Sequence, residues 1–174
     1  MAGRTSQPQV WMTQINKQQA QGLVLRWWSR LAPLPGGRRV FSLALGRLAP
    51  YSGGIGAQVE ELGVGYARVK MRDRRRLRNH LRSLHAIALI NLGELATGLA
   101  VLSTLSDNMR GIVLNIRADY LKKARGEITA IAAFELPADP VDDSACEVEA
   151  QLQDESGDIV TRVRATWLIG YKTT

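Results

Sequence analysis

The sequence AIALINLGELATGLAVLST, residues 86–104, decides the fold of this chain. It is apolar on nearly every side when wound as a helix, and Glu94 is its one charged residue. A helix of this kind has to be buried on all sides, either in a protein core or in a membrane. A membrane span would place Glu94 near the bilayer centre, at a cost of about 2.5–3.5 kcal/mol. We therefore predict a central core helix and no membrane span.

Segments that alternate like β-strands lie on both sides of this helix. Before it, residues 55–59 and 66–72 predict a hairpin in which Ala67, Val69 and Met71 share one face. After it, about four antiparallel strands are expected. The first of these strands has Ile112, Leu114 and Ile116 as its inward residues, and the second lies within residues 127–136. The inward residues of the third are Cys146, Val148, Ala150 and Leu152, and those of the fourth are Val163, Ala165, Trp167 and Ile169.

The order of these elements predicts an α+β fold. Residues 23–31 read as an amphipathic helix, and residues 51–54 as a loop. A helix that is apolar all round needs a strongly curved antiparallel sheet wrapped around it, which is the hot-dog fold. We expect two parts: a short N-terminal helical extension over residues 1–50, packed on the domain, and a hot-dog domain over residues 51–174.

Composition limits the chemistry and the compartment. The 174 residues include one cysteine, Cys146, and two histidines, so no disulfide can form within the chain and a Cys/His zinc site is not expected. No metal or other cofactor is predicted. The polar, glutamine-rich segment 1–17 lacks the apolar core of a signal peptide, and a cytoplasmic location is the expectation.

Charge is distributed unevenly along the chain, whose formal net charge is +7. Residues 68–82 hold eight basic residues against Asp73, whereas residues 135–158 hold nine acids and no basic residue. A positive pole favours polyanions such as nucleic acid, anionic lipid or a phosphorylated small molecule, although a solvated arginine segment would have the same composition. Nucleic acid is disfavoured, because the segment lacks interleaved aromatic residues and any base-reading motif.

Glu94 is the best catalytic candidate in the chain. A carboxylate in an apolar helix is costly to bury, and burial raises its pKa toward the range in which it acts as a base or nucleophile. A buried partner or access to solvent would also explain it. However, no Lys or Arg lies between Arg82 and Arg110, so the helix itself supplies no ion-pair partner.

The start of the same helix offers a second group of candidates. Amides of a first helical turn are free donors that can form an oxyanion hole, and Asn79 and His85 lie just before it. Each is otherwise typical of a turn or a cap. Nine residues separate His85 from Glu94, or roughly 13 Å along a helix. Both ends cannot reach one carbonyl group within a single chain, so joint action predicts a homodimer with shared sites.

These residues resemble the hot-dog thioesterase superfamily, near its phenylacetate-degradation-type branch and a related group of bacterial hot-dog proteins. That branch has an Asn, a His-Gly-Gly and a catalytic Asp nine residues after the His; Asn79, His85 and Glu94 occupy these places. Residues 119–126 (DYLKKARG) also match its strand-end signature. Ala86-Ile87 replaces the Gly-Gly pair and Glu replaces Asp. The resemblance covers roughly residues 51–171.

The resemblance implies hydrolysis of acyl-CoA thioesters without a cofactor. Glu94 would be base or nucleophile, the backbone of Ala86 the oxyanion donor, and His85 and Asn79 its orienting residues. The substrate would be an acyl-CoA-type thioester, and the assembly a homodimer or a tetramer. The phosphates of coenzyme A are expected to bind Lys122, Lys123, Arg125 and Arg82. The alternative function is a non-catalytic hot-dog protein that binds an acyl-CoA or acyl-carrier thioester.

Overall fold

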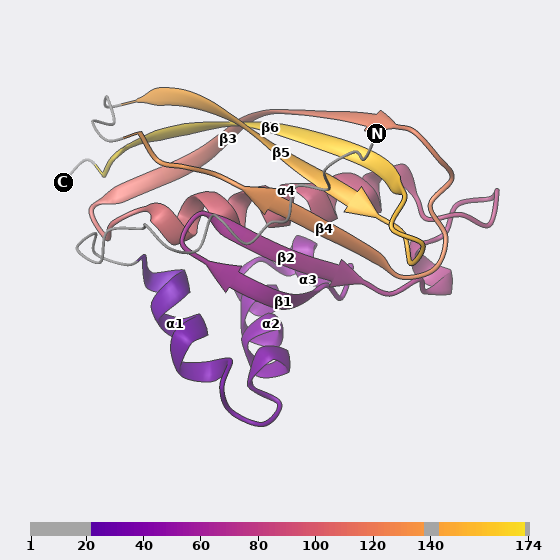
Figure 1. Ribbon diagram of the computed structural model, residues 1–174, viewed down its shortest axis with the longest axis horizontal. Coiled ribbons are helices and arrows are strands. Elements are labelled where there is room, and N and C mark those ends of the chain that lie inside the picture. The colour runs from indigo at the N-terminus through magenta and orange to yellow at the C-terminus, as the bar shows by residue number, and fades with distance from the viewer. Residues whose placement is uncertain (1–21, 138–142, 173–174) are drawn as a thin grey trace, which may run out of the picture.

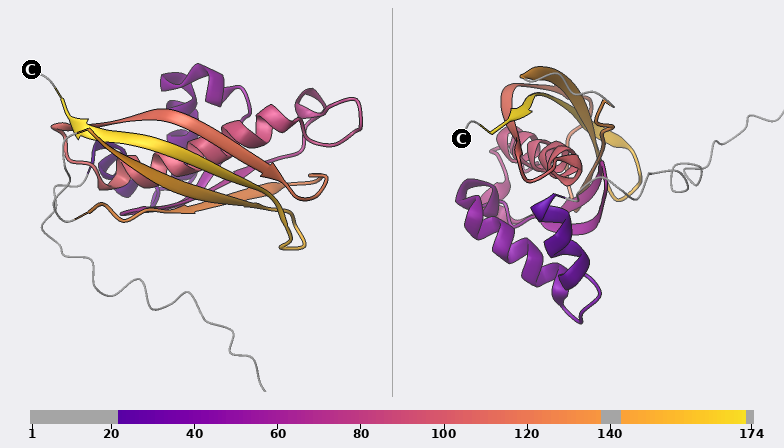
Figure 2. Two further views of the ribbon diagram at one scale, coloured as in Figure 1. Left: turned by 90° about the horizontal axis from the view of Figure 1, so that it is seen from above. Right: turned by 90° about the vertical axis from the view of Figure 1, so that its left-hand side faces the viewer.

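The computed structural model describes residues 22–137 and 143–172, and its centre is the helix α4, Ala86–Thr104. A single antiparallel sheet, in the order β1-β2-β4-β5-β6-β3, curves around α4, with shorter helices on the open side (Figures 1 and 2). This architecture confirms the predicted α+β hot-dog fold. The other elements are α1 Leu23–Leu31, α2 Gly37–Leu48, α3 Pro50–Gly53, β1 Gln58–Gly63, β2 Tyr66–Met71, β3 Met109–Tyr120, β4 Ile128–Ala133, β5 Ser144–Gln153 and β6 Ile159–Tyr171.

Helix α4 is long and apolar enough to cross a membrane, yet most of it is buried inside the curved sheet. Two glycines allow it to lie close to β6. A Cβ added at Gly93 would be 2.5 Å from the Cβ of Val163, and one at Gly98 would be 3.0 Å from the ring of Trp167. The indole N–H of Trp167 also donates to Thr97 Oγ1 at 3.3 Å. These contacts fix α4 against β6.

The strands after α4 follow the predicted alternation, with one exception in β3. In β6, Val163, Ala165, Trp167 and Ile169 are all buried. In β3, the register against β6 shifts between Val113 and Asn115. Val113 and Ile116 therefore pack on the core, while Ile112 and Leu114 are exposed, so the predicted inward face of Ile112, Leu114 and Ile116 is wrong for two of its members. A bulge adds one residue on one strand and reverses the side-chain alternation beyond it.

The N-terminal helices pack on the same core as α4. Leu25, Trp28 and Phe41 belong to the main buried cluster, and Trp28 meets Phe41 edge to face with ring centroids 5.1 Å apart. The predicted loop at residues 51–54 is wrong, because α3 forms a short helix there with Pro50 in its first turn, where the fixed φ of proline favours helix entry. The boundary between the predicted parts 1–50 and 51–174 stays a prediction.

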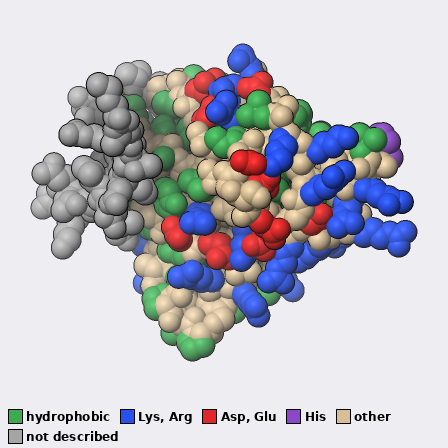
Figure 3. Space-filling model, turned by 45° about the vertical axis from the view of Figure 1, so that its right-hand side comes forward, with side chains coloured by type: hydrophobic (Ala, Val, Ile, Leu, Met, Phe, Trp, Pro, Cys, Tyr) green, Lys and Arg blue, Asp and Glu red, His purple; other side chains and the backbone are tan. Residues whose placement is uncertain are grey.

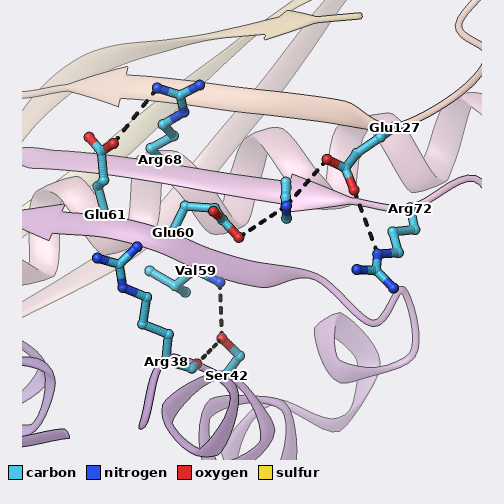
Figure 4. A network of polar contacts seen from close by, with 9 residues as sticks. Arg38, Ser42, Val59, Glu60, Glu61, Arg68, Arg72 and Glu127 are labelled. Atoms are coloured by element: carbon cyan, nitrogen blue, oxygen red, sulfur yellow. Dashed lines mark hydrogen bonds and ion pairs between the residues drawn. The ribbon is translucent and has the colours of Figure 1, made fainter. Parts of the chain in front are cut away.

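The two edges of the sheet differ. At the β1 edge, the hydroxyl oxygen of Ser42 in α2 accepts from the Val59 N–H at 3.0 Å and donates to the carbonyl of Arg38 at 2.7 Å (Figure 4). On the outer face of the sheet, Lys70 of β2 forms ion pairs with Glu60 of β1 and with Glu127, the residue before β4, each at 3.3 Å (Figure 4). At the opposite edge, strand β3 pairs with β6 on one side, and no strand of the described chain pairs with its other side. Edges left open in this way are available to a further strand.

Candidate active site on the central helix

Glu94 is a partly buried carboxylate without a partner. No hydrogen bond or ion pair reaches its carboxylate from any residue in the described ranges 22–137 and 143–172. Burial raises the pKa of Glu94 above its ordinary value of 4.5, and no neighbouring charge opposes that shift. The carboxylate is thus poised to take up a proton more readily than an exposed glutamate.

Asn91 lies one helical turn before Glu94 and was missed by the sequence interpretation. Its Nδ2 donates a long hydrogen bond of 3.5 Å to the backbone carbonyl of Tyr51 in α3. Its Oδ1 is buried and has no donor among the described residues. Residues three apart on a helix share a side, so Asn91 and Glu94 form a polar pair on an otherwise apolar helix. That isolation in the sequence was a signal that could have identified Asn91.

The start of α4 keeps one free amide. His85 is the N-cap, and its Nδ1 accepts from the N–H of Ile87 at 3.2 Å. Its carbonyl accepts from the N–H groups of Ala88 and Leu89. The N–H of Ala86 has no acceptor in the described chain. Ala86 is therefore the one residue of the first turn up to Leu89 whose amide can bind an external oxygen.

Asn79 organises the loop that leads into α4. Its Oδ1 accepts from the N–H of Leu81 at 2.9 Å and from both the N–H and the hydroxyl of Ser83 at 3.2 Å. The helix start is held further by the N–H of His85, which donates to the carbonyl of Leu77 at 2.8 Å. Asn79 thus shapes the turn around the helix start, and its side chain is not brought to Glu94.

A second loop is bound to this helix start. The N–H of Leu84 donates to the carbonyl of Ala124 at 2.9 Å, so the β3–β4 connection lies beside the residues before α4. Asp73 strengthens the junction by accepting from Arg78 Nε at 2.6 Å and from the Gly126 N–H at 3.2 Å. The hydrogen bond from Arg78 has the largest effect on the pKa of Asp73 and lowers it below 3.8. Burial acts in the opposite direction with a smaller effect.

The predicted phosphate-binding residues gather near this end of the molecule with unequal availability. Lys122 Nζ donates to Asp154 at 2.9 Å and to Asp158 at 2.6 Å, hydrogen bonds that raise its pKa to about 12. Arg82, Lys123 and Arg125 are exposed and have no ion pair in the described chain. Figure 3 shows Lys and Arg side chains concentrated on this side of the molecule.

The described residues contain no cluster of three or more His, Cys, Asp or Glu side chains that could hold a metal ion. Two groups of this region can act on a ligand: the carboxylate of Glu94 can transfer a proton, and the amide of Ala86 can donate a hydrogen bond. A carboxylate and an oxyanion donor are the two groups that water attack on a carbonyl requires.

Solved structures with the same fold support the architecture. A structural-genomics protein designated APC5556 is 28% identical, with a TM-score of 0.73 over 86% of this chain and 98% of its own. PA5026 from Pseudomonas aeruginosa, described as a probable thioesterase, is 23% identical, with a TM-score of 0.68 over 80% of this chain and 97% of its own. The thioesterase HI1161 from Haemophilus influenzae is 19% identical, with a TM-score of 0.63 over 73% of this chain and 88% of its own.

The sequence comparisons give a family without an activity. No curated protein matches the chain. A family model matches residues 37–169, which covers α2 through almost all of β6. The chain belongs to the DUF4442 family, a domain of unknown function.

Proposed function

We propose that this protein hydrolyses the thioester of an acyl-CoA, with Glu94 as the base. The observation that carries the proposal is the unpartnered Glu94 carboxylate, whose pKa is raised by burial on the central helix. Buried carboxylates are normally paired, and a raised pKa is typical of carboxylates that transfer protons. The shared fold with proteins described as thioesterases agrees with this reaction.

The reaction follows from the two polar groups of α4. Glu94 removes a proton from water as the water oxygen attacks the thioester carbonyl carbon. The N–H of Ala86 donates to the oxygen on which negative charge develops. The carbon–sulfur bond then breaks, and the proton held by Glu94 passes to the departing thiolate. The products are a carboxylic acid and a free thiol.

The separation of these groups requires two subunits. Ala86 and Glu94 are eight residues apart in one continuous helix, roughly 12 Å along its axis. A homodimer that presents the helix start of one chain to Glu94 of the other overcomes this separation. Ile112 and Leu114 are 48% and 57% exposed near the open β3 edge, where apolar side chains favour such an interface. We place this dimer in the cytoplasm, as the sequence predicts.

The acyl group is a finer part of the proposal. Asn79, His85 and Glu94 have the spacing of the phenylacetate-degradation-type branch, which makes aromatic acyl-CoAs the first substrates to test. Arg82, Lys123 and Arg125 are candidates for coenzyme A phosphates at the helix start. Lys122 is a weaker candidate, because Asp154 and Asp158 already neutralise its charge.

The test is an assay of thiol release with short, long and aromatic acyl-CoAs, on wild type and Glu94→Gln. We expect turnover by wild type and a loss of about 100-fold or more in kcat for Glu94→Gln, the usual effect of removing a general base. Sedimentation of the same samples tests the dimer. Absence of turnover on every thioester, or full activity in a monomer, would contradict the proposal.

One observation favours a second function, binding of an acyl-CoA or acyl-carrier thioester without hydrolysis. The Ile87 N–H is already occupied by His85, and the Ile87 side chain is 48% exposed beside the free amide of Ala86. A single donor beside a large apolar side chain makes a weaker oxyanion site than the Gly-Gly pair implied by the resemblance. Tight binding of an acyl-CoA that stays intact would favour this second function.

A further inference from the structure

A cavity of about 460 Å³ lies outside the site described above. Its walls come from α2, α3, β1 and the segment that follows β2, and Leu95 of α4 contributes to its lining. Its volume is in the usual range of small-molecule sites, roughly 300–1,000 Å³. Leu95 directly follows Glu94, so the cavity and the candidate base lie on adjoining sides of the same helical turn.

The charge in this cavity has one sign. Its lining includes Arg39 and Arg47 from α2 and Arg74 and Arg76 from the segment after β2, and it includes no acidic residue. None of the four guanidinium groups forms an ion pair with a carboxylate in the described chain. By contrast, Arg72 and Arg78 of the same basic segment pair with Glu127 and Asp73. Four uncompensated guanidinium groups around one cavity favour a multiply charged anion.

One of these arginines is hydrogen-bonded to the backbone, and a second lies against it. Arg76 donates to the carbonyl of Gly54 at 3.0 Å. Arg74 lies against Gly56, where an added Cβ would be 2.5 Å from its Nη1, and Gly56 has a φ of +64°. Any larger residue at Gly56 would displace that guanidinium and strain the backbone. The lining also includes Leu43, which is 62% exposed, and Leu95, which is partly buried, so an anion here has apolar surface beside it.

We propose that this cavity binds the phosphate groups of an amphipathic ligand, whose less polar part rests on Leu43 and Leu95. Among ligands of this kind we favour coenzyme A. Only this choice of ligand rests on the proposed function. Arginine binds phosphate through paired N–H donors, and four arginines can hold more than one phosphate group. As the place where the phosphates of coenzyme A bind, this cavity is an alternative to the exposed residues Arg82, Lys123 and Arg125 at the helix start, none of which lines it.

The test is calorimetric titration of the full chain with coenzyme A, inorganic pyrophosphate and pantetheine, which lacks phosphate. The variant is Arg39→Gln/Arg47→Gln, since both side chains are exposed on α2 and the described structure gives them no bond that folding requires. The matched control is Arg30→Gln/Arg38→Gln, which removes the same charge from exposed positions of α1 and α2 outside the cavity. Circular dichroism checks that both variants fold.

We expect wild type to bind coenzyme A and pyrophosphate but not pantetheine. The cavity variant should lose at least about tenfold in affinity for both, and the control should stay within about twofold. No binding of either phosphate ligand by wild type, or equal losses in the two double variants, would overturn the proposal. Arginine-dependent binding of coenzyme A without hydrolysis of any thioester would remove the proposed function and keep this site. Hydrolysis of a thioester with no effect of Arg39→Gln/Arg47→Gln on binding or KM would keep the proposed function and remove this site.

Discussion

The segment before α4 and the middle of α4 each contain one acidic residue. The two carboxylates differ in their bonding partners and in the direction of their pKa shifts. Asp73 is held by Arg78 and by the backbone of Gly126, and its pKa is lowered. Glu94 has neither a cation nor a donor in the described chain, and its pKa is raised. The basic segment can supply a partner within five residues, whereas the helix has no basic residue to supply one.

This difference separates a structural carboxylate from one that is available to a ligand. Asp73 joins the segment after β2 to the β3–β4 connection, so its bonds contribute to stability. Glu94 is a cost to the folded state, because burial disfavours its charged form and no bond offsets that penalty. Groups retained at such a cost are frequent in functional sites.

The largest expected effect is on activity, and it should separate the two residues. Glu94→Gln is expected to lower kcat by about 100-fold or more. Asp73→Asn keeps the shape of the side chain and is expected to leave kcat within about threefold of wild type, since in the described chain Asp73 bonds only Arg78 and Gly126 and touches neither Glu94 nor the amide of Ala86. Steady-state assays on one acyl-CoA compare them. Equal losses in the two variants would remove the distinction between the two carboxylates.

The next effect is on stability, and its order is reversed. Asp73→Asn weakens an ion pair and a hydrogen bond at a junction where the Asp73 side chain is 11% exposed and that of Arg78 is 43% exposed, so we expect a loss of about 1 kcal/mol in the free energy of unfolding. Glu94→Gln should lose none at neutral pH, because a neutral amide is cheaper to bury than a carboxylate. Urea unfolding measures both. Greater destabilisation by Glu94→Gln than by Asp73→Asn would show that Glu94 has a structural partner.

The central features of the fold could be predicted from the sequence, because each depends on local pattern. An apolar helix with one charge and strands with strict alternation need no knowledge of distant contacts. The bulge in β3 could not be predicted, since it depends on the register between β3 and β6, which are paired across more than 40 residues of chain (Ala118 with Val163, for example). The helix α3 was mistaken for a loop because two glycines outweighed the signal of Pro50.

The candidate site was predictable where single residues carry the signal. Glu94 is conspicuous in an apolar helix, and so is Asn91 once the same criterion is applied to uncharged polar residues. Contacts between distant segments account for what was missed. Lys122 is neutralised by acids more than 30 residues away, and the arginine-lined cavity combines α2 with residues after β2.

The pH dependence of stability should differ in sign between the two carboxylates. Glu94 has a folded pKa above 4.5, so the folded state binds more protons from about pH 4.5 up to that pKa, and its contribution falls as pH rises through this window. Asp73 has a folded pKa below 3.8, so its contribution is present above 3.8 and is lost as pH falls through the folded pKa. Urea unfolding from about pH 3 to pH 8 measures both slopes. Glu94→Gln should reduce the fall in the free energy of unfolding as pH rises above about 4.5. Asp73→Asn should reduce the fall in the free energy of unfolding as pH drops below 3.8. The same profile in wild type and both variants would contradict both assignments.

The smallest effect extends the comparison to Asn91, an uncharged group in the same situation as Glu94. Its Oδ1 is buried without a donor, whereas its Nδ2 forms only a long bond of 3.5 Å to Tyr51. Asn91→Leu has nearly the same volume and removes an unsatisfied acceptor, so we expect the free energy of unfolding to rise by about 0.5–1 kcal/mol. Asn91→Ala is the matched control, because it removes the same acceptor but leaves a cavity and should destabilise. If Asn91→Leu is stabilising and also lowers turnover, the unsatisfied oxygen is kept for the ligand, since a purely structural asparagine would not improve stability at the expense of activity. A loss of stability in Asn91→Leu would instead show that the bond to Tyr51 holds α3 against α4.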